Sequence, residues 1–365
     1  MKLKIETTIL KEMVSKAVKG ANIIKHKDNS VSGMIGIELK SNKLTLHTTD
    51  SYDNYLYIIQ NDVEGEDFYI VIEIEQFAKL ISKMTSEYIT LELKDRMLEV
   101  KGNGKYDIEI PVDMSGNTDE FIKFPDPISS MDLSDTTPVD LSTIRAILNT
   151  AKSSIATTEE MPAYTGYYVG DKIITTDRCK LCAINNNLFN SKKILISQAT
   201  MNLLDLITYD MIEVCIQDDT IVFITPNCIV YGILMDCVDD YQITTINSIL
   251  DTSFDSVCKI DKSNILAILD RISLFVGAYD KKAIRLNFTE NGIDISSIKT
   301  NGIETIDYIE SENFKPFTCL IDIDMFTSQI KANTDDVIEL HYGNEQLVSI
   351  VNDNITQIIC LIADN

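Results

Sequence analysis

The segment Ile5-Glu-Thr-Thr-Ile9-Leu10 joins an alternating, strand-like run to a helical pattern, and two later segments repeat it. These are Val139-Asp-Leu-Ser-Thr-Ile144 and Ile260-Asp-Lys-Ser-Asn-Ile265-Leu266. In each segment a polar residue that can cap a helix precedes apolar residues at helical spacing, which predicts a short strand followed by an amphipathic helix. The anchor positions 9, 144 and 265 are 135 and 121 residues apart. A period of this length is too long for a solenoid and indicates domain-sized repeats.

A second strand-to-helix junction also occurs three times. It reads Ile74-Glu75, Ile196-Ser197 and Ile323-Asp324, at spacings of 122 and 127 residues. In each case an isoleucine is followed by a polar or acidic residue, which we interpret as a helix N-cap. Two junctions per repeat predict six helices, at 9–25, 76–84, 140–155, 197–208, 261–276 and 322–333.

Each repeat closes with three short β runs that are separated by polar turn residues. The runs are Ile89–Leu93, Met97–Lys101 and Lys105–Val112, then Ile212–Ile216, Ile221–Thr225 and Cys228–Met235, then Val337–His341, Gln346–Val351 and Ile355–Leu361. Polar linkers at 115–137 and 236–256 separate the repeats. We therefore predict an α+β protein of three repeated domains, at 1–125, 126–250 and 251–365, each with two helices on antiparallel sheet.

Composition restricts the class of protein. The chain has 365 residues, of which 45% are apolar and 24% charged, and these fractions exclude disordered and fibrous proteins. The longest apolar runs are far too short to span a bilayer, and residues 1–20 lack the apolar core of a secretion signal. Eight cysteines without a small disulfide framework predict free thiols in a reducing cytoplasm.

The net charge of −24 is unevenly distributed. The six predicted helices hold eleven basic and seven acidic residues and so carry +4, which leaves −28 on the other 283 residues. Lysines on a solvated helix face are common in any protein, so this excess alone is weak support for a binding surface. With helices repeated on one face, a mildly basic helical surface inside an acidic shell favours a protein that admits DNA at one place and repels it elsewhere.

The chain resembles the bacterial sliding clamp, the beta subunit of DNA polymerase III, over its whole length. Four segments carry the resemblance in the same order as in that family: Asp95-Arg-Met-Leu-Glu-Val100 before a glycine-rich turn, Thr176-Asp-Arg-Cys-Lys-Leu181, Asp240-Tyr241, and Ile284-Arg-Leu-Asn-Phe-Thr-Glu-Asn-Gly-Ile-Asp-Ile295. The resemblance implies a non-catalytic processivity factor without cofactor or metal. Two chains would form a head-to-tail homodimeric ring whose helices surround duplex DNA, and the ring would tether the DNA polymerase and meet a clamp loader.

Three sets of residues follow from the resemblance. The DNA-facing candidates chosen by helix face are Lys11, Lys16, Lys19, Lys79, Lys83, Arg145, Lys152 and Lys331, and Lys25 and Lys27 are added from the loop that follows the first helix. The partner-peptide pocket between the second and third domains would use Tyr164, Thr176, Lys180, Leu181, Thr244, Ile358, Cys360, Leu361 and Ile362. The dimer interface would use the edge strand Lys105, Tyr106, Ile108 and Ile110 together with Leu274 and Phe275.

The sequence departs from the family at the pocket. The family's Gly and His are Arg178 and Cys179 here, its Pro before Asp-Tyr is Asp239, and its Met-rich terminus is Cys360-Leu-Ile-Ala-Asp-Asn365. These departures bear on pocket shape and on the partner motif. Our hypothesis is that the clamp is borne by a phage or plasmid rather than a chromosome.

Other chemistry has weaker support in the sequence. Cys179-Lys-Leu-Cys182 is a C-x-x-C, but residues i and i+3 of a strand point to opposite faces, so we expect structural thiols rather than a metal or redox site. The three histidines fall in different repeats, and no P-loop, G-x-G-x-x-G or G-x-S-x-G occurs. Two alternatives stay open: an acidic DNA mimic or inhibitor that binds a replication protein, and a divalent-metal hydrolase.

Overall fold

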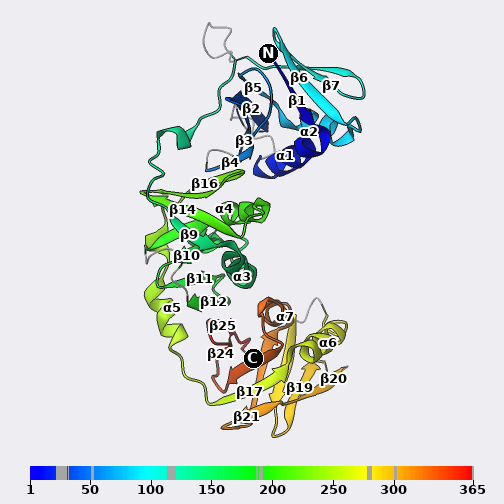
Figure 1. The fold of residues 1–365 in the computed structure, drawn as a ribbon. Coiled ribbons are helices and arrows are strands. Elements are labelled where there is room, and N and C mark those ends of the chain that lie inside the picture. The colour runs from blue at the N-terminus through cyan, green and yellow to red at the C-terminus, as the bar shows by residue number, and fades with distance from the viewer. Residues whose placement is uncertain are drawn as a thin grey trace. The chain divides into compact units, whose positions relative to one another are not determined.

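The structure is a computed structural model of the chain (Figure 1). It describes residues 1–21, 31, 33–50, 53–112, 121–158, 160–185, 188, 192–277, 282–299 and 302–363. Within these residues one order of elements occurs three times: a strand, a helix, four strands, a second helix and three strands, with one extra short strand in the third repeat.

The elements have the following bounds. The first repeat holds β1 (Lys2–Glu6), α1 (Thr7–Gly20), β2 (Met34–Lys40), β3 (Lys43–Thr49), β4 (Asn54–Gln60), β5 (Phe68–Glu73), α2 (Ile74–Lys83), β6 (Tyr88–Lys94), β7 (Met97–Lys101) and β8 (Lys105–Glu109). The second holds β9 (Thr137–Asp140), α3 (Leu141–Ala151), β10 (Gly166–Val169), β11 (Lys172–Thr176), β12 (Lys180–Asn185), β13 (Ile194–Ser197), α4 (Gln198–Asn202), β14 (Met211–Gln217), β15 (Thr220–Thr225) and β16 (Cys228–Ile233). The third holds β17 (Ser256–Asp261), α6 (Lys262–Ser273), β18 (Ala283–Phe288), β19 (Gly292–Ser297), β20 (Ile303–Asp307), β21 (Glu310–Glu312), β22 (Phe317–Asp322), α7 (Ile323–Ala332), β23 (Val337–Tyr342), β24 (Leu347–Val351) and β25 (Ile355–Cys360).

Two of the four antiparallel sheets contain strands from two repeats. One has the order β5-β2-β3-β4-β16-β15-β14-β9, and the other has the order β13-β10-β11-β12-β25-β24-β23-β17-β21. The two remaining sheets, β1-β6-β7-β8 and β20-β19-β18-β22, each belong to one repeat. Backbone hydrogen bonds therefore join the first repeat to the second through β4–β16, and the second to the third through β12–β25.

Backbone pairing across these joints is as continuous as pairing inside a repeat, so the second repeat is shared between two compact units. One compact unit consists of Met1–Ser142 and Ala199–Leu234, and the other of Thr143–Gln198 and Met235–Asn365. The predicted α+β class with three repeats of two helices on antiparallel sheet is confirmed, whereas the domain boundaries at 125 and 250 stay a prediction.

The cores follow from helical periodicity. In the first unit α1 buries Leu10, Met13, Val14 and Ala17, which lie on one helix face and pack toward β3, β4 and α2. In the second unit α6 and α7 lie side by side (Figure 1) and bury the same kind of stripe against the third-repeat sheets.

Several predicted helix bounds need correction. The helix predicted at 9–25 is α1, which begins at Thr7 and ends at Gly20, and residues 22–25 lie outside the described part of the chain. The predicted helix 197–208 is only α4 followed by the 3₁₀ turn Leu203–Leu206. The helix 140–155 is α3 followed by the 3₁₀ turn Lys152–Ser154.

The predicted caps at Glu75 and Asp324 are also wrong, because α2 and α7 have already begun one residue earlier. The side chain that caps α7 is Asp322, which accepts a hydrogen bond from the backbone N–H of Met325 at 2.9 Å. Asp261 caps α6 in the same way through the N–H of Asn264 at 2.8 Å.

The segment predicted as a polar linker at 236–256 contains helix α5 (Ile243–Leu250). Its apolar residues recur at helical spacing and one of them, Ile246, is buried. In the described part of the chain, no helix combines the length and the hydropathy needed to cross a membrane.

Candidate functional site

A pocket of about 260 Å³ lies in the second compact unit, between α5, the β11–β12 turn and the end of β25. It combines an apolar floor with a polar rim, as partner-peptide pockets do. The lining residues are Tyr164, Thr176, Arg178, Cys179, Lys180, Leu181, Gln242, Thr245, Ile246, Ile249, Leu347, Ile358 and Cys360.

The floor belongs to one buried apolar cluster that contains Tyr164, Leu181, Ile246 and Ile358. Leu181 of β12 and Ile358 of β25 lie directly opposite each other in the joint between the second and third repeats. Tyr241 fixes the start of α5 over this cluster, because its hydroxyl donates to the carbonyl of Ile174 at 3.1 Å. The pocket therefore exists because α5 covers the joint.

Tyr241 is also held by neighbouring rings. Its ring stacks on Tyr168 with centroids 4.9 Å apart and meets the edge of Tyr164 at 5.1 Å. Burial raises the pKa of Tyr241 well above its ordinary value, so the phenol stays neutral and keeps its proton for the bond to Ile174.

A tight turn forms the rim of the pocket. Asp177 Oδ1 accepts from the backbone N–H groups of Cys179 at 2.9 Å and Lys180 at 2.7 Å, and Thr176 Oγ1 accepts from the N–H of Arg178 at 3.0 Å. Arg178 has φ +76°, the left-handed region that favours glycine. A side chain at this position projects outward, so Arg178 adds a cation to the rim where a glycine would add nothing.

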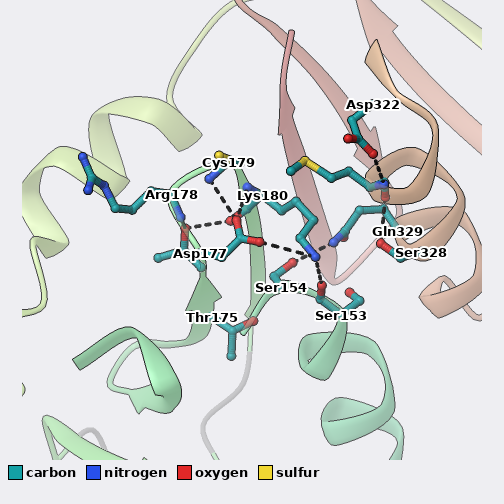
Figure 2. A network of polar contacts seen from close by, with 12 residues as sticks. Ser153, Ser154, Thr175, Asp177, Arg178, Cys179, Lys180, Asp322, Ser328 and Gln329 are labelled. Carbon is teal, nitrogen blue, oxygen red and sulfur yellow. Dashed lines mark hydrogen bonds and ion pairs between the residues drawn. The ribbon is translucent and has the colours of Figure 1, made fainter. Parts of the chain in front are cut away.

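Lys180 turns its ammonium group away from the rim (Figure 2). Its Nζ donates to the carbonyl of Ser153 at 2.5 Å and pairs with Asp177 at 3.4 Å, and only 14% of the side chain is exposed. Beside it, the Nε2 group of Gln329 in α7 donates to the hydroxyl of Ser154 at 2.8 Å. Lys180 thus ties β12 to the end of the second repeat's first helix.

Six of the nine residues predicted for the pocket line it: Tyr164, Thr176, Lys180, Leu181, Ile358 and Cys360. Thr244 is exposed on α5 one residue before the lining residue Thr245. Leu361 packs against the third-repeat core, and Ile362 pairs with Leu320 through its N–H at 2.8 Å. Both residues follow β25, which ends at Cys360, and a role for them in partner binding stays a prediction.

Sequence reasoning missed the lining residues Gln242, Thr245, Ile246, Ile249 and Leu347. The three-residue spacing of isoleucines 243, 246 and 249 is the sequence signal for those on α5. Arg178 and Cys179, which depart from the family's Gly and His, line the pocket as well. Among the described lining residues Arg178 and Lys180 are basic and none is acidic, and Asp177 of the rim turn pairs with Lys180.

The basic helix candidates divide by their surroundings. Lys16 pairs with Glu12 at 2.7 Å and Lys79 with Glu75 at 2.5 Å, each one helical turn apart. Arg145 and Lys152 lie on α3 and the turn after it, and they too take part in polar interactions.

Four further candidates are Lys11, Lys19, Lys83 and Lys331, which have no ion-pair partner among the described residues. Lys19, Lys83 and Lys331 are exposed in the last turns of α1, α2 and α7. The candidates Lys25 and Lys27 lie outside the described residues.

The residues predicted for a dimer interface lie in two places, in or next to β8 and directly after α6. Tyr106 of β8 and Phe275 after α6 are 42% and 49% exposed, and Leu274 is 81% exposed. Ile108 and Ile110 are 3% and 2% exposed, so their side chains belong to the core of the first unit rather than to a contact surface.

The side chain of Lys105 pairs with Glu99, a carboxylate that also binds Lys94 at 2.7 Å and Lys101 at 2.6 Å and is only 1% exposed. What Lys105 offers to a partner is therefore its outward backbone N–H and C=O. No group of three or more His, Cys, Asp or Glu side chains in the described residues could hold a metal ion.

Comparison with known proteins relates this fold to sliding clamps. No protein-family model and no curated protein matches the sequence. Among solved structures, the chain is similar to the DNA polymerase sliding clamp of Bacillus subtilis (TM-score 0.85, 16% identity, 100% of both chains covered). It is also similar to the DNA polymerase III beta chain of Streptococcus pneumoniae (0.85, 13%, 99% of both) and the beta subunit of Thermotoga maritima (0.82, 16%, 100% of both). The chain therefore has the three-repeat clamp fold.

Proposed function

We propose that this chain is a DNA sliding clamp: a non-catalytic processivity factor that forms a head-to-tail ring of two copies around duplex DNA and tethers a DNA polymerase. The observation that carries the proposal is the pair of equivalent joints inside the chain. Each joint pairs the last strand of one repeat with the third strand of the four-strand run in the repeat before it. The equivalent strands left over are β8 of the first repeat and β20 of the third, and among the described residues each has one outer edge that no strand covers.

The two internal joints have the same register. At β4–β16, Tyr57 lies opposite Ile229, and hydrogen bonds bracket the joint at Ile59 N to Asn227 O and Ile233 N to Asp53 O, each 2.8 Å. The β12–β25 joint is bracketed in the same way by Asn185 N to Asn354 O and Cys360 N to Cys179 O, each 2.9 Å. Ala183 lies opposite Thr356 there, in the place of Tyr57 and Ile229.

Buried hydroxyl residues align the third repeat with the other two. Thr48 of β3 donates to the carbonyl of Ala17 at 3.1 Å, and Thr175 of β11 donates to the carbonyl of Ala151 at 2.7 Å. In the third repeat, Ser297 of β19 is 2% exposed and takes the position that corresponds to Thr48 and Thr175. With this alignment Ile303 of β20 takes the place of Tyr57 and Ala183.

The same reasoning assigns the partner of Ile303. In the strand that closes each repeat, Ile108 aligns with Gly232 and Ile359. Three positions earlier in the same strands, Lys105 of β8 therefore corresponds to Ile229 and Thr356. In a head-to-tail dimer, Ile303 of one copy would therefore lie opposite Lys105 of the other, in a continuous antiparallel sheet.

Side chains around β20 support this assembly. Ile303 is 66% exposed, and the ring of Phe275 lies against Gly302 at the start of the same edge. Leu274 and Phe275 extend the apolar surface beside it. Exposed apolar residues next to an open strand edge are typical of an interface rather than of free surface.

The ring would meet DNA through its helices and partners through the pocket. The described helices carry nine basic and four acidic residues, a weak positive field that suits sliding because tight phosphate contacts would stop it. The pocket floor of Tyr164, Leu181, Ile246 and Ile358 would accept aliphatic or aromatic anchors of a linear segment of the polymerase or of a clamp loader. A cytoplasmic location remains a prediction.

A cross-link between the two edges tests the ring. The double variant Lys105→Cys, Ile303→Cys should oxidise to a covalent dimer, because residues directly opposite in an antiparallel pair have Cα atoms about 5.5 Å apart, within disulfide range. The matched control, Lys105→Cys with Thr305→Cys, moves one thiol by about 7 Å along the strand and should not close. A dimer has twice the 41.1 kDa of one chain, and mapping of the linked peptides identifies the bond.

The encircling of DNA is tested with the same variant. Chains diluted to monomers, mixed with nicked circular plasmid, concentrated and oxidised should remain on the plasmid through a high-salt wash. Cutting the plasmid once should release them. Release by salt alone would show ordinary surface binding, and a strict monomer at every concentration would overturn the ring.

A further inference from the structure

Two cysteines face each other across the joint at the pocket rim. Cys360 ends β25 and Cys179 precedes β12, and their sequence positions continue the register in which Lys180 lies opposite Ile359. The backbone N–H of Cys360 donates to the carbonyl of Cys179 at 2.9 Å, which continues the ladder and places the two residues at opposed positions, while the N–H of Cys179 donates to Asp177 Oδ1. Such pairs have Cα atoms about 5.5 Å apart, close to the commonest separation in disulfides.

These two thiols differ from the other six. Cys179 and Cys360 are exposed and both line the pocket, whereas Cys182, Cys215, Cys228, Cys258 and Cys319 are buried and Cys237 is half-buried. Burial raises the pKa of the thiols of Cys182, Cys228, Cys258 and Cys319 to about 12, which leaves them inert to exchange.

Electrostatics are consistent with the proximity of the pair. Partial burial raises the pKa of the Cys360 thiol, and the nearby charges of Cys179 and Asp177 raise it further. The sulfur of Cys360 also lies 3.7 Å from the carbonyl oxygen of Arg178, on the rim turn itself. Cys182, which completes the C-x-x-C motif in sequence, is fully buried on the other face of β12 and takes no part.

We propose that Cys179 and Cys360 are a thiol pair that forms a reversible disulfide across the β12–β25 joint, with a low-molecular-weight disulfide as oxidant. One cysteine thiolate attacks the oxidant, forms a mixed disulfide and releases one reduced thiol. The second cysteine then attacks the mixed disulfide, forms the Cys179–Cys360 bond and releases the other reduced thiol. Two cysteines are oxidised, one disulfide is reduced, and the two protons lost by the cysteines are taken up by the released thiols.

The bond would change the mouth of the pocket. It would tie the rim turn to the end of β25, and it would replace two movable thiols that line the pocket with one fixed bridge. An effect on partner binding rests on the proposed function, whereas formation of the bond does not. Failure of the one is therefore distinguishable from failure of the other.

The test treats the native full-length chain with oxidised glutathione. We expect the wild type to lose two reactive thiols without retaining glutathione, and peptide mapping to find Cys179 joined to Cys360. Cys179→Ser and Cys360→Ser should each stop at one retained glutathione, because the second attack has no nucleophile. The control Cys237→Ser should behave as the wild type, and dithiothreitol should restore both thiols.

Two results would overturn the proposal. One is a wild type that keeps glutathione on both cysteines, which would show that the thiols do not reach each other. The other is a bond between two copies of the chain. As a second measurement, amide hydrogen exchange at Lys180 and Ile359 should slow in the oxidised protein and stay unchanged in treated Cys360→Ser.

Discussion

Gln329 is a polar residue buried where the second and third repeats meet. Its side chain is fully buried in α7, donates to the Ser154 hydroxyl at 2.8 Å and accepts from the Gln357 amide at 2.7 Å. The Gln357 amide also donates to the Gln329 carbonyl at 3.1 Å. The Oε1 atom of Gln357 is buried without a hydrogen-bond partner among the described residues, so the bonds made by Gln329 carry the stabilisation of this network.

Removing the centre of this network should therefore be costly. We expect Gln329→Ala to lower the free energy of unfolding by about 2–4 kcal/mol, because Ser154 and Gln357 are left with unpaired buried groups. Lys331→Ala, on the same helix but exposed, should change it by less than about 0.5 kcal/mol. Urea unfolding followed by fluorescence and circular dichroism measures both. Equal effects of the two changes would contradict the network.

The carboxyl group of Glu38 in β2 makes the free energy of unfolding depend on pH. The His47 ring, 3.6 Å away, holds the pKa of the Glu38 carboxyl below its usual value. The unfolded chain therefore binds more protons at this site below about pH 4.3, and the stabilisation, present above that pH, is lost as pH falls through the folded pKa.

Because Glu38 is one-third exposed, the effect is modest. We expect Glu38→Gln to reduce stability by about 0.5 kcal/mol at pH 5 and by nothing measurable near pH 3. Glu64→Gln, at an exposed position without an ion pair among the described residues, should show no such difference. Urea unfolding midpoints of both variants and the wild type at pH 5 and pH 3 measure this difference. If Glu38→Gln is still less stable than the wild type at pH 3, the effect comes from packing instead.

At the scale of elements, alternate residues of β8 direct their backbone groups to different contacts, one set to β7 and the other to the proposed dimer partner. Ile110 donates to Arg96 at 2.9 Å and Gly102 to Gly104 at 3.0 Å, so the even-numbered residues of β8 bond to β7 and the odd-numbered ones face the open edge. Asp107→Pro removes one outward N–H and no inward one. It should weaken the dimer about tenfold while Asp107→Ala leaves it intact.

Light scattering over a dilution series compares the two substitutions. Thermal unfolding of the monomer serves as the check that Asp107→Pro still folds. If proline and alanine weaken the dimer equally, the side chain rather than the outward N–H makes the contact. The β-strand joint proposed for the ring would then be wrong.

Elements with local signals could be predicted and contacts between repeats could not. The apolar spacing around Ile9 and Ile265 indicated α1 and α6, and the turn residues around Asp95 separated β6 from β7. Helix α5 was missed because acidic residues on both sides hid its short isoleucine pattern. The Gln329–Ser154 contact joins residues 175 positions apart, and no periodicity in one chain encodes such a pair.

At the scale of the whole molecule, charge is distributed unevenly between the helices and the rest of the chain. The chain carries −24, yet the helices carry an excess of basic residues. Lys11, Lys19 and Lys83 of the first repeat belong to that excess and have no ion-pair partner among the described residues. Lys40, Lys43 and Lys123 are exposed outside the helices of the same repeat and provide a control of equal charge.

Reversing the helix lysines should weaken DNA retention without loosening the dimer. We expect Lys11→Glu, Lys19→Glu, Lys83→Glu together to reduce the slope of log affinity against log salt by about 3, one phosphate contact per lysine. Lys40→Glu, Lys43→Glu, Lys123→Glu changes net charge equally and should leave the slope unchanged. Binding to nicked circular plasmid across a salt series measures both. Equal loss in both triples would mean that net charge, not the helix surface, governs DNA binding, whereas loss of the dimer in the first triple would place those lysines in an interface.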